Sequence, residues 1–315
     1  TDIFQGCAGV ILLSAELDDA TIDFFTQLAG DRIQTTHKLD NSIPTQKRNI
    51  ELLGTETAEG KRTINNRTPE VAHILRTLGA LKAVASGRRA IAIASDNQNL
   101  LERIDELLLD QGYRTFRLDS KSSDDREPFL KNPDEWLGTN RIDVLLYSPS
   151  AESGLDISIK NYFYKTFVLY HGVVDIDGIL QMAGRIRDCD NYLFTAREYA
   201  KTDEDGLNST SARHLQRCIM GYLTEDLKLS DLDEDTTQTL NDQFAAQNDH
   251  FWIRHATSQM ALWNFEKINL WDNLRTALEN QGHAIALCTP ETDPELKERL
   301  QGYGKTILKN EAFHT

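Results

Sequence analysis

The sequence has 315 residues, of which 40% are hydrophobic and 26% charged, and its formal net charge is −15. This is the composition of a globular protein with ample apolar material for a core, and the length suggests about two domains. Such an excess of carboxylates repels phosphate, which argues against nucleic-acid binding over the whole surface. No apolar run approaches the roughly 18 residues that a transmembrane helix needs.

The charge is unevenly distributed along the chain. Residues 40–89 contain nine Lys/Arg against five Asp/Glu, whereas residues 201–250 contain four against eleven. A polyanion would therefore meet the first region and avoid the second. The basic pairs at 47–48 and 61–62 are compatible both with contacts to a phosphate backbone and with a solvated loop.

The four cysteines are scattered and show no metal-site spacing. They are Cys7, Cys189, Cys218 and Cys288, with no CxxC pair and no Cys/His pair at zinc-ligand spacing. We therefore expect free thiols, no metal site and a reducing, cytoplasmic environment. No basic leader or small-residue cleavage site is visible at the start. Because the sequence lacks an initiator Met and enters an apolar run almost at once, we expect it to be part of a longer protein.

The first elements along the chain are a strand and a helix. GVILLSAEL, residues 9–17, is a continuous apolar run, which predicts a strand buried on both faces. Residues 18–30 predict a helix with aspartates at its start and a glycine at its end. Residues 31–66 read as irregular, with short strands and basic side chains.

Residues 68–196 predict an α/β domain. A helix begins at Thr68, which can cap it, and has Pro69 in its first turn. Strand and helix patterns then alternate at 88–96, 97–112, 113–120, 125–138 (interrupted at Pro133), 141–150, 165–172, 175–188 and 191–196. This alternation predicts a parallel sheet flanked by helices.

From residue 197 the alternation stops. Residues 206–223 read as a helix, residues 229–242 as an acidic exposed segment, and residues 250–282 as a long aromatic helix. We predict a mainly α-helical C-terminal unit at 197–315. Its tryptophans could stack on bases, but at helical spacing they are typical of a core.

Sites in a parallel α/β sheet form at the carboxyl ends of the strands. Three loops follow predicted strands, SDNQN at 95–99, SPSAESGLDIS at 148–158 and HGVVDIDG at 171–178, and we expect them to converge on one edge. In the second loop, Gly154 allows the backbone to approach a ligand, and Asp156 can hold a turn, a hydroxyl or an arginine.

The helix after the third loop carries Gln181, Arg185 and Arg187. Gln181 and Arg185 are four residues apart and share a face. An arginine held on a rigid helix can stabilise the charge that develops in phosphoryl transfer. The alternative is that both arginines are surface residues paired with Asp188 and Asp190.

These segments resemble the motifs of superfamily 2 helicases, in the correct order over roughly residues 9–196. The resemblances are GVILLSAEL to motif III, IAIASDNQN to the motif IV strand and loop, FRLDS to the strand-end segment that contacts the nucleic-acid backbone, SPSAESGLDIS to motif V and QMAGRIR to motif VI, usually Q-x-x-G-R-x-x-R. More narrowly, the chain resembles the helicase-like part of plasmid or phage replication proteins with primase-helicase organisation.

The resemblance implies that residues 68–196 are a second RecA-like domain and that residues 1–67 are the end of a first helicase domain and a basic connector. The second domain would close over ATP and Mg²⁺ bound mainly by an upstream RecA-like domain. Arg185 and Arg187 would reach the γ-phosphate, with Gln181 in support.

Further roles follow from the same resemblance. Gly154 and Asp156 would sense the nucleotide. Ser95, Asn97, Ser120 and Ser148 lie where the family contacts the backbone of DNA or RNA, through hydroxyls and N–H groups that do not read the base sequence. We expect DNA as the partner, and no membrane.

The sequence departs from the family pattern at two motifs. The motif III threonine is replaced by Glu16. The second motif VI arginine is expected at position 188, which is Asp188, and Arg187 comes one residue early. Which arginine acts stays open, and Arg185 is favoured.

The ATP-binding motifs are not recognisable. The only Gly-Lys-Thr, residues 304–306, has Arg299 where a P-loop requires glycine, and no acidic motif II follows a buried strand. We therefore expect the C-terminal portion of an ATP-dependent helicase or translocase, inactive alone, in plasmid or phage DNA replication. The alternatives are a helicase-like binding module without ATPase activity and a glycosyltransferase, whose nucleotide-sugar domain is also an α/β sheet with Gly-rich loops.

Overall fold

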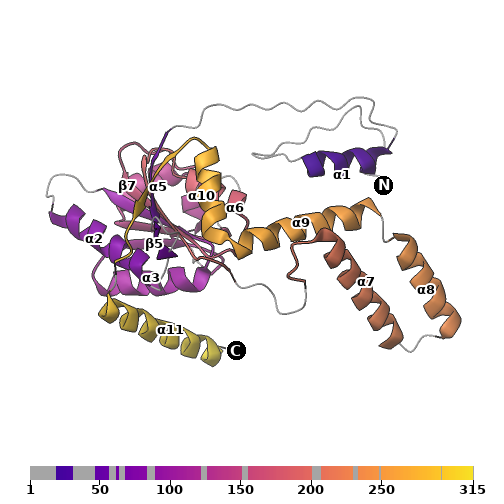
Figure 1. Cartoon of the computed structure of the whole chain (residues 1–315). Helices are drawn as coiled ribbons and strands as arrows, with labels where there is room; N and C mark the ends of the chain where they lie inside the picture. Colours follow the sequence, from indigo (N-terminus) through magenta and orange to yellow (C-terminus); the bar gives the residue numbers. More distant parts are fainter. Residues whose placement is uncertain are drawn as a thin grey trace. The chain divides into compact units, whose positions relative to one another are not determined.

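A seven-stranded parallel sheet forms the centre of the larger of two compact units (Figure 1). The structure is a computed structural model. It describes residues 19–30, 47–56, 62–63, 68–83, 89–121, 126–150, 155–200, 207–229, 233–247, 250–291 and 293–314.

Each unit combines two stretches that are distant in sequence. The sheet unit comprises Pro44–Ala200 and Asn269–Thr315, and the helical unit comprises Thr1–Ile43 and Lys201–Ile268. The chain therefore leaves the sheet unit once and returns to it.

The strands of the sheet lie in the order β5-β6-β4-β7-β8-β1-β9, and every neighbouring pair is parallel. Their bounds are β1 Asn49–Leu53, β4 Ala90–Ser95, β5 Thr115–Leu118, β6 Val144–Tyr147, β7 Phe163–Tyr170, β8 Asn191–Ala196 and β9 Ala284–Cys288. A separate antiparallel pair consists of β2 (Thr55–Glu56) and β3 (Arg62–Thr63). Because all seven strands run the same way, their carboxyl ends form one edge of the sheet and their amino ends form the other.

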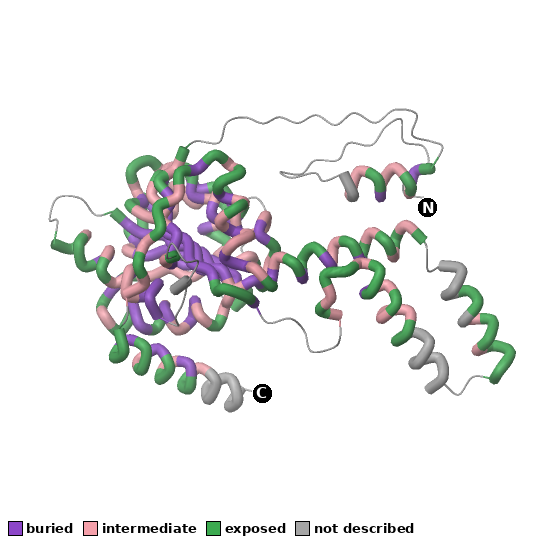
Figure 2. Tube along the Cα trace, viewed as in Figure 1, coloured by how far each residue is buried: buried purple, intermediate pink, exposed green. Residues whose placement is uncertain are grey.

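Helices of the sheet unit pack on both faces, and the strands between them are buried (Figure 2). Their bounds are α2 Pro69–Ala83, α3 Gln98–Asp110, α4 Arg126–Lys131, α5 Pro133–Asn140, α6 Ile176–Gly184, α10 Leu270–Asn280 and α11 Pro294–His314. The helices α2, α3 and α11 contribute Ile74, Leu107 and Leu300 to one apolar cluster. The helices α5, α6 and α10 contribute to the other cluster, on the opposite face.

Local signals set the start of α3 and the break between α4 and α5 close to where the sequence predicts them. The Asn97 side chain caps α3 by accepting a hydrogen bond from the Leu100 N–H at 3.1 Å. The predicted interruption at Pro133 is confirmed, because α4 ends at Lys131 and α5 begins at Pro133. The predicted fold class, a parallel sheet flanked by helices and followed by mainly α-helical structure, is confirmed by the strand order and the order of the elements.

The structure divides the C-terminal part of the chain differently from the expected helical unit at 197–315. Only residues 201–268 belong to the helical unit, while 269–315 return to the sheet unit and supply the strand β9. The long helix expected at 250–282 is two helices that are separated at Asn269. The cause is long-range pairing, because β9 is a five-residue apolar strand that forms only against β1.

The strand β1 likewise belongs to the sheet, although the sequence assigns residues 1–67 to a preceding domain and a connector. It pairs with β8 and β9. The fully buried Trp271 of α10 supports this end of the sheet by donating from Nε1 to the Leu53 carbonyl at 3.0 Å. Gly54 has φ +147°, and a Cβ there would lie 3.0 Å from Trp271 Nε1, so glycine permits this close packing. The strand expected at 9–17 lies outside the described residues.

The helical unit contains α1 Asp19–Ala29, α7 Ala212–Leu229, α8 Glu234–Gln247 and α9 Phe251–Ile268. Phe24 of α1 packs its ring against Phe251, Trp252 and His255 of α9, at centroid distances of 5.5, 4.5 and 4.5 Å. Trp252 nevertheless remains 50% exposed, so it is not the core residue that its helical spacing predicts. Across the described residues, no helix is both long and apolar enough to span a membrane.

Two adjacent leucines of α3 test which face of the helix packs into the core. Leu108 is fully buried, whereas Leu109 is 50% exposed. We expect Leu108→Ala to lower the free energy of unfolding by about 2–5 kcal/mol, because it leaves a cavity in the core. The matched control Leu109→Ala should change it by less than about 0.5 kcal/mol. Urea denaturation measures both, and equal effects would contradict the assigned face of α3.

Candidate functional site

Three of the predicted contact residues lie at the carboxyl edge of adjacent strands. Ser120, Ser148 and Ser95 follow or end β5, β6 and β4, which are neighbours in the sheet. Each hydroxyl has a protein partner. Ser95 Oγ donates to the Leu169 carbonyl at 2.9 Å, Ser148 Oγ lies 2.7 Å from Ser150 Oγ, and Ser120 Oγ donates to Gln98 Oε1 at 3.0 Å.

The four predicted residues differ in solvent exposure. Ser95 and Ser148 are buried, so their hydroxyls stabilise the loops. Ser120 is exposed, and Asn97 is half-buried as the cap of α3. Ser120 is therefore the predicted residue at this edge that is best placed to meet an external ligand.

A buried carboxylate that the sequence reasoning missed organises the loop after β7. Asp96 has a fully buried side chain, and its two oxygens accept the backbone N–H groups of His171 at 2.8 Å and Val173 at 2.7 Å. His171 Nδ1 lies 3.5 Å from Asp96 Oδ1. Asp96 thus ties the end of β4 to the loop that leads into α6. The sequence signal that could have identified Asp96 is its position directly after the predicted strand.

Glu70 is a second buried carboxyl group near this edge. It lies in the first turn of α2 and is 9% exposed. Burial raises the pKa of Glu70, and the charges of His171 and Arg197 oppose that rise. Burial prevails because removing a carboxylate from water disfavours its charged form.

The expectation that one helix carries both arginines is wrong, because α6 ends at Gly184, Arg185 is its C-cap and Arg187 lies beyond it. Asp175 caps the start of α6 by accepting from the Gly178 N–H at 2.7 Å, directly after β7. The helix then crosses one face of the sheet and ends at Gly184, before β8 begins at Asn191. Tyr147, the residue before Ser148, donates from its hydroxyl to the Met182 carbonyl at 3.0 Å, so the last turn of α6 packs against the end of β6.

The structure does join the motif V-like and motif VI-like segments. Ile157 and Ile186 form a parallel bridge, in which the Ile157 N–H donates to the Arg185 carbonyl at 2.9 Å and the Arg187 N–H donates to the Ile157 carbonyl at 2.8 Å. Beside this bridge, Arg187 Nε donates to Asp156 Oδ1 at 2.8 Å. Two residues assigned to the nucleotide by resemblance thus meet in the fold. The third, Gly154, lies outside the described residues.

The two arginines have different surroundings. Arg187 and its partner Asp156 both have side chains that are more than half exposed. Arg185 is half-buried near Tyr147, and burial lowers the pKa of its guanidinium. Gln181 is exposed on α6.

Asp188, which stands where the family pattern has its second arginine, stabilises a loop. Its carboxylate accepts from Lys160 Nζ at 3.1 Å and from the Asn161 N–H at 2.6 Å, just before β7. The alternative from the sequence paired the two arginines with Asp188 and Asp190. For Arg187 this is not the case, because its partner is Asp156.

Gly304-Lys305-Thr306 lies inside α11. Thr306 Oγ1 donates to the Gly302 carbonyl at 3.2 Å, within the helix. A phosphate-binding loop presents free backbone N–H groups, and a helix interior does not. Among the described residues, no group of three His, Cys, Asp or Glu side chains could hold a metal ion.

No protein-family model and no curated protein sequence matches this chain. Solved structures do match. The C-terminal part of the Fun30 ATPase domain has a TM-score of 0.30 and 14% identity over 56% of this chain and 54% of that one, so the match spans about half of the Fun30 structure. Domain 2 of the DEAD-box helicase Mss116p, bound to an RNA duplex, has a TM-score of 0.35 and 7% identity over 76% of this chain and 99% of that one. Neither likeness defines a ligand or an activity here.

The buried Glu70 predicts a pH-dependent effect on stability. Because its pKa is raised in the folded state, the folded protein binds a proton more tightly than the unfolded chain. The resulting stabilisation is present at low pH and is lost as the pH rises through the folded-state pKa. Glu70→Gln imitates the protonated form, so its free energy of unfolding relative to the native protein should be higher at about pH 8 than at about pH 5.

Urea denaturation at the two pH values measures this difference. The exposed Glu295→Gln also removes one carboxylate and is the matched control for the general effect of losing a charge. A Glu70→Gln difference that is equal at both pH values would show that Glu70 is ionised in the fold throughout.

Proposed function

We propose that this chain is the C-terminal portion of an ATP-dependent nucleic-acid helicase or translocase. The observation that carries the proposal is the bridge between Ile157 and Ile186, together with the Asp156–Arg187 ion pair. These contacts join two segments whose resemblance to motifs V and VI was noted from sequence alone. Their proximity supports a common role at one nucleotide.

In this proposal the arginines act on a nucleotide that an upstream RecA-like domain holds with Mg²⁺. A guanidinium offers five N–H donors in a planar fork. Among the described residues, Arg187 uses only its Nε, for Asp156, so its terminal nitrogens can donate to a phosphate. Asp156 would orient the fork toward the developing charge, and no step requires a proton from either side chain.

Arg187 becomes the better placed of the two arginines because it is exposed and held in position. The sequence favours Arg185 as the acting arginine, but Arg185 is partly buried. Its partial burial suits a supporting role at the end of α6. Gln181 would contact the same ligand from the exposed side of α6. The nucleic acid would meet the carboxyl edge at Ser120. Plasmid or phage DNA replication, and DNA rather than RNA, rest on the sequence resemblance alone.

The proposal predicts an effect of the arginines on ATP hydrolysis by the parent protein, including whatever precedes Thr1. Arg187→Ala should reduce nucleic-acid-stimulated turnover by about a hundredfold or more while ATP binding is retained, because arginine fingers act on the transition state. Arg185→Ala is measured beside it, and the exposed Lys297→Ala is the charge-matched control.

Three results separate the readings. Loss with Arg185→Ala alone would assign the finger to that residue. Unchanged turnover in both variants would refute the arginine-finger role. An inactive native parent that still binds nucleic acid would establish the binding-module alternative.

A further inference from the structure

The two edges of the sheet differ in charge. Within the three positions before each strand, the described residues include six basic and three acidic side chains, namely Lys47, Arg48, Arg89, Arg114, Arg141 and Lys160 against Asp143, Asp188 and Asp190. Within the three positions after each strand there are two basic and five acidic side chains, namely Lys121 and Arg197 against Glu56, Asp96, Asp119, Glu198 and Glu291. The amino edge is thus a basic surface in a protein of net charge −15.

Part of this basic charge is not neutralised locally. Arg114 pairs with Asp143 at 3.1 Å and Lys160 pairs with Asp188 at 3.1 Å. The other four cations form no ion pair among the described residues, although Arg89 is near enough to Asp188 to contribute to the lowered pKa of that carboxyl; these four are Lys47, Arg48, Arg89 and Arg141. Arg48 instead places its guanidinium 4.7 Å from the centre of the Tyr192 ring.

An exposed aromatic side chain lies near the amino end of β7, the strand next to β4 in the sheet. β4 pairs Ala90 with Phe163 and then Ile91 with Lys165, so Tyr164 is the extra residue of a bulge and has no partner on β4. A bulge redirects the side chain that it inserts. Tyr164 is consequently 41% exposed, next to the amino end of a strand that is otherwise largely buried.

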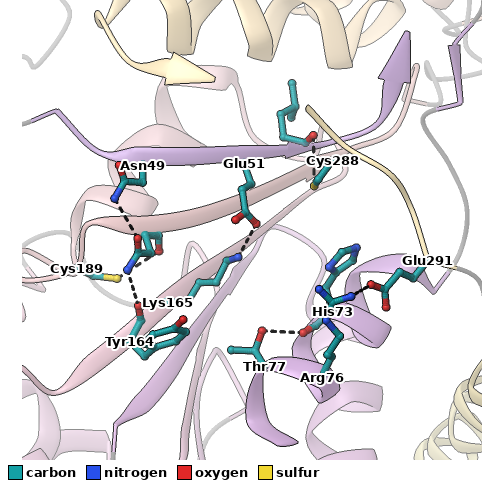
Figure 3. A network of polar contacts seen from close by, with 12 residues as sticks. Asn49, Glu51, His73, Arg76, Thr77, Tyr164, Lys165, Cys189, Cys288 and Glu291 are labelled. Carbon is teal, nitrogen blue, oxygen red and sulfur yellow. Dashed lines mark hydrogen bonds and ion pairs between the residues drawn. The ribbon is translucent and has the colours of Figure 1, made fainter. Parts of the chain in front are cut away.

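A chain of side-chain amides holds the bulge in place (Figure 3). Asn191 Nδ2 donates to the Tyr164 carbonyl at 3.3 Å, and Asn49 Nδ2 donates to Asn191 Oδ1 at 3.2 Å. The bulge is therefore tied to the amino ends of β8 and β1. One carboxylate on these strands, Glu51, is paired with Lys165 at 2.6 Å.

The strand order sets these groups in a row. Arg141 precedes β6, Arg89 precedes β4, Tyr164 lies on β7 and Arg48 precedes β1, which is the order β6-β4-β7-β8-β1 across the sheet. Neighbouring strands are about 4.8 Å apart, so the row spans about 19 Å. Cations spaced along a groove and an exposed ring for base stacking are the features that bind single strands without sequence preference.

We propose that the amino edge around Tyr164 binds single-stranded nucleic acid. Tyr164 stacks on a base, and Arg141, Arg89 and Arg48 contact the phosphates on either side. This surface is distinct from Ser120, which lies at the carboxyl edge. It adds a binding site to the proposed function and does not depend on ATP hydrolysis.

Fluorescence anisotropy of this chain with a labelled oligothymidylate of about 20 nucleotides tests the proposal. Tyr164→Ala should weaken binding about five- to a hundredfold, since each stacked base contributes substantially to affinity. Tyr164→Phe keeps the ring and should bind within about twofold of the native protein. The matched control is Tyr199→Ala, since Tyr199 is 63% exposed after the carboxyl end of β8. An unchanged thermal midpoint shows that the Tyr164→Ala variant is folded.

A charge variant tests the phosphate contacts separately. The double substitution Arg89→Glu and Arg141→Glu should make the dependence of log affinity on log salt shallower by about 1.4, because two counterions fewer are released. The control double substitution Lys131→Glu and Lys297→Glu reverses two exposed lysines elsewhere in the sheet unit and should leave the slope unchanged.

Three results would overturn the proposal. The first is no binding at low salt, or equal affinity of Tyr164→Ala and the native protein. The second is weakening by Tyr199→Ala instead, which would place the strand at the carboxyl edge and leave the proposed function intact. The third is displacement of the oligonucleotide by polyglutamate with no effect of Tyr164→Ala, which would identify the surface as one for acidic polypeptides. Because ATP turnover is not measured here, none of these results decides the role of Arg187.

Discussion

The parallel pairing of β4 on both sides is the constraint on which the rest of the sheet unit depends. All six residues of β4 are buried, and β6 and β7 flank it in the same direction. A parallel partner cannot be reached by a tight turn, so the chain returns over a face of the sheet between strands. Every loop that follows a strand thus lies at one edge, and every loop that precedes a strand lies at the other.

Because the two edges are separate, residues that are close in sequence can lie in different parts of the sheet unit. The loop after β7 is held at the carboxyl edge by Asp96, whereas Arg187 follows the end of α6 and meets Asp156. The bridge between Ile157 and Ile186 fastens that end of the helix.

Polar groups inside the carboxyl edge are used for structure. Asp96 satisfies both oxygens with backbone N–H groups, and Ser95 bonds to the backbone of β7. Buried polar atoms need such partners, because an unmade hydrogen bond in the interior costs more than a made one contributes. Glu70 shows the consequence for an ionisable group, since its burial raises the pKa. A hydroxyl or carboxylate at a strand end is therefore not a ligand-binding group by position alone.

The sequence by itself determined the alternation of strands and helices between β4 and β8, the interruption at Pro133 and the absence of a P-loop at Gly304. These depend on hydrophobic period and local backbone chemistry, which are readable over a few residues. Only the tertiary structure decided that β1 and β9 complete the sheet, that Arg187 meets Asp156 and that Tyr164 is extruded by a bulge. Strand partners and register depend on packing between residues far apart in the chain, and no local pattern encodes that choice.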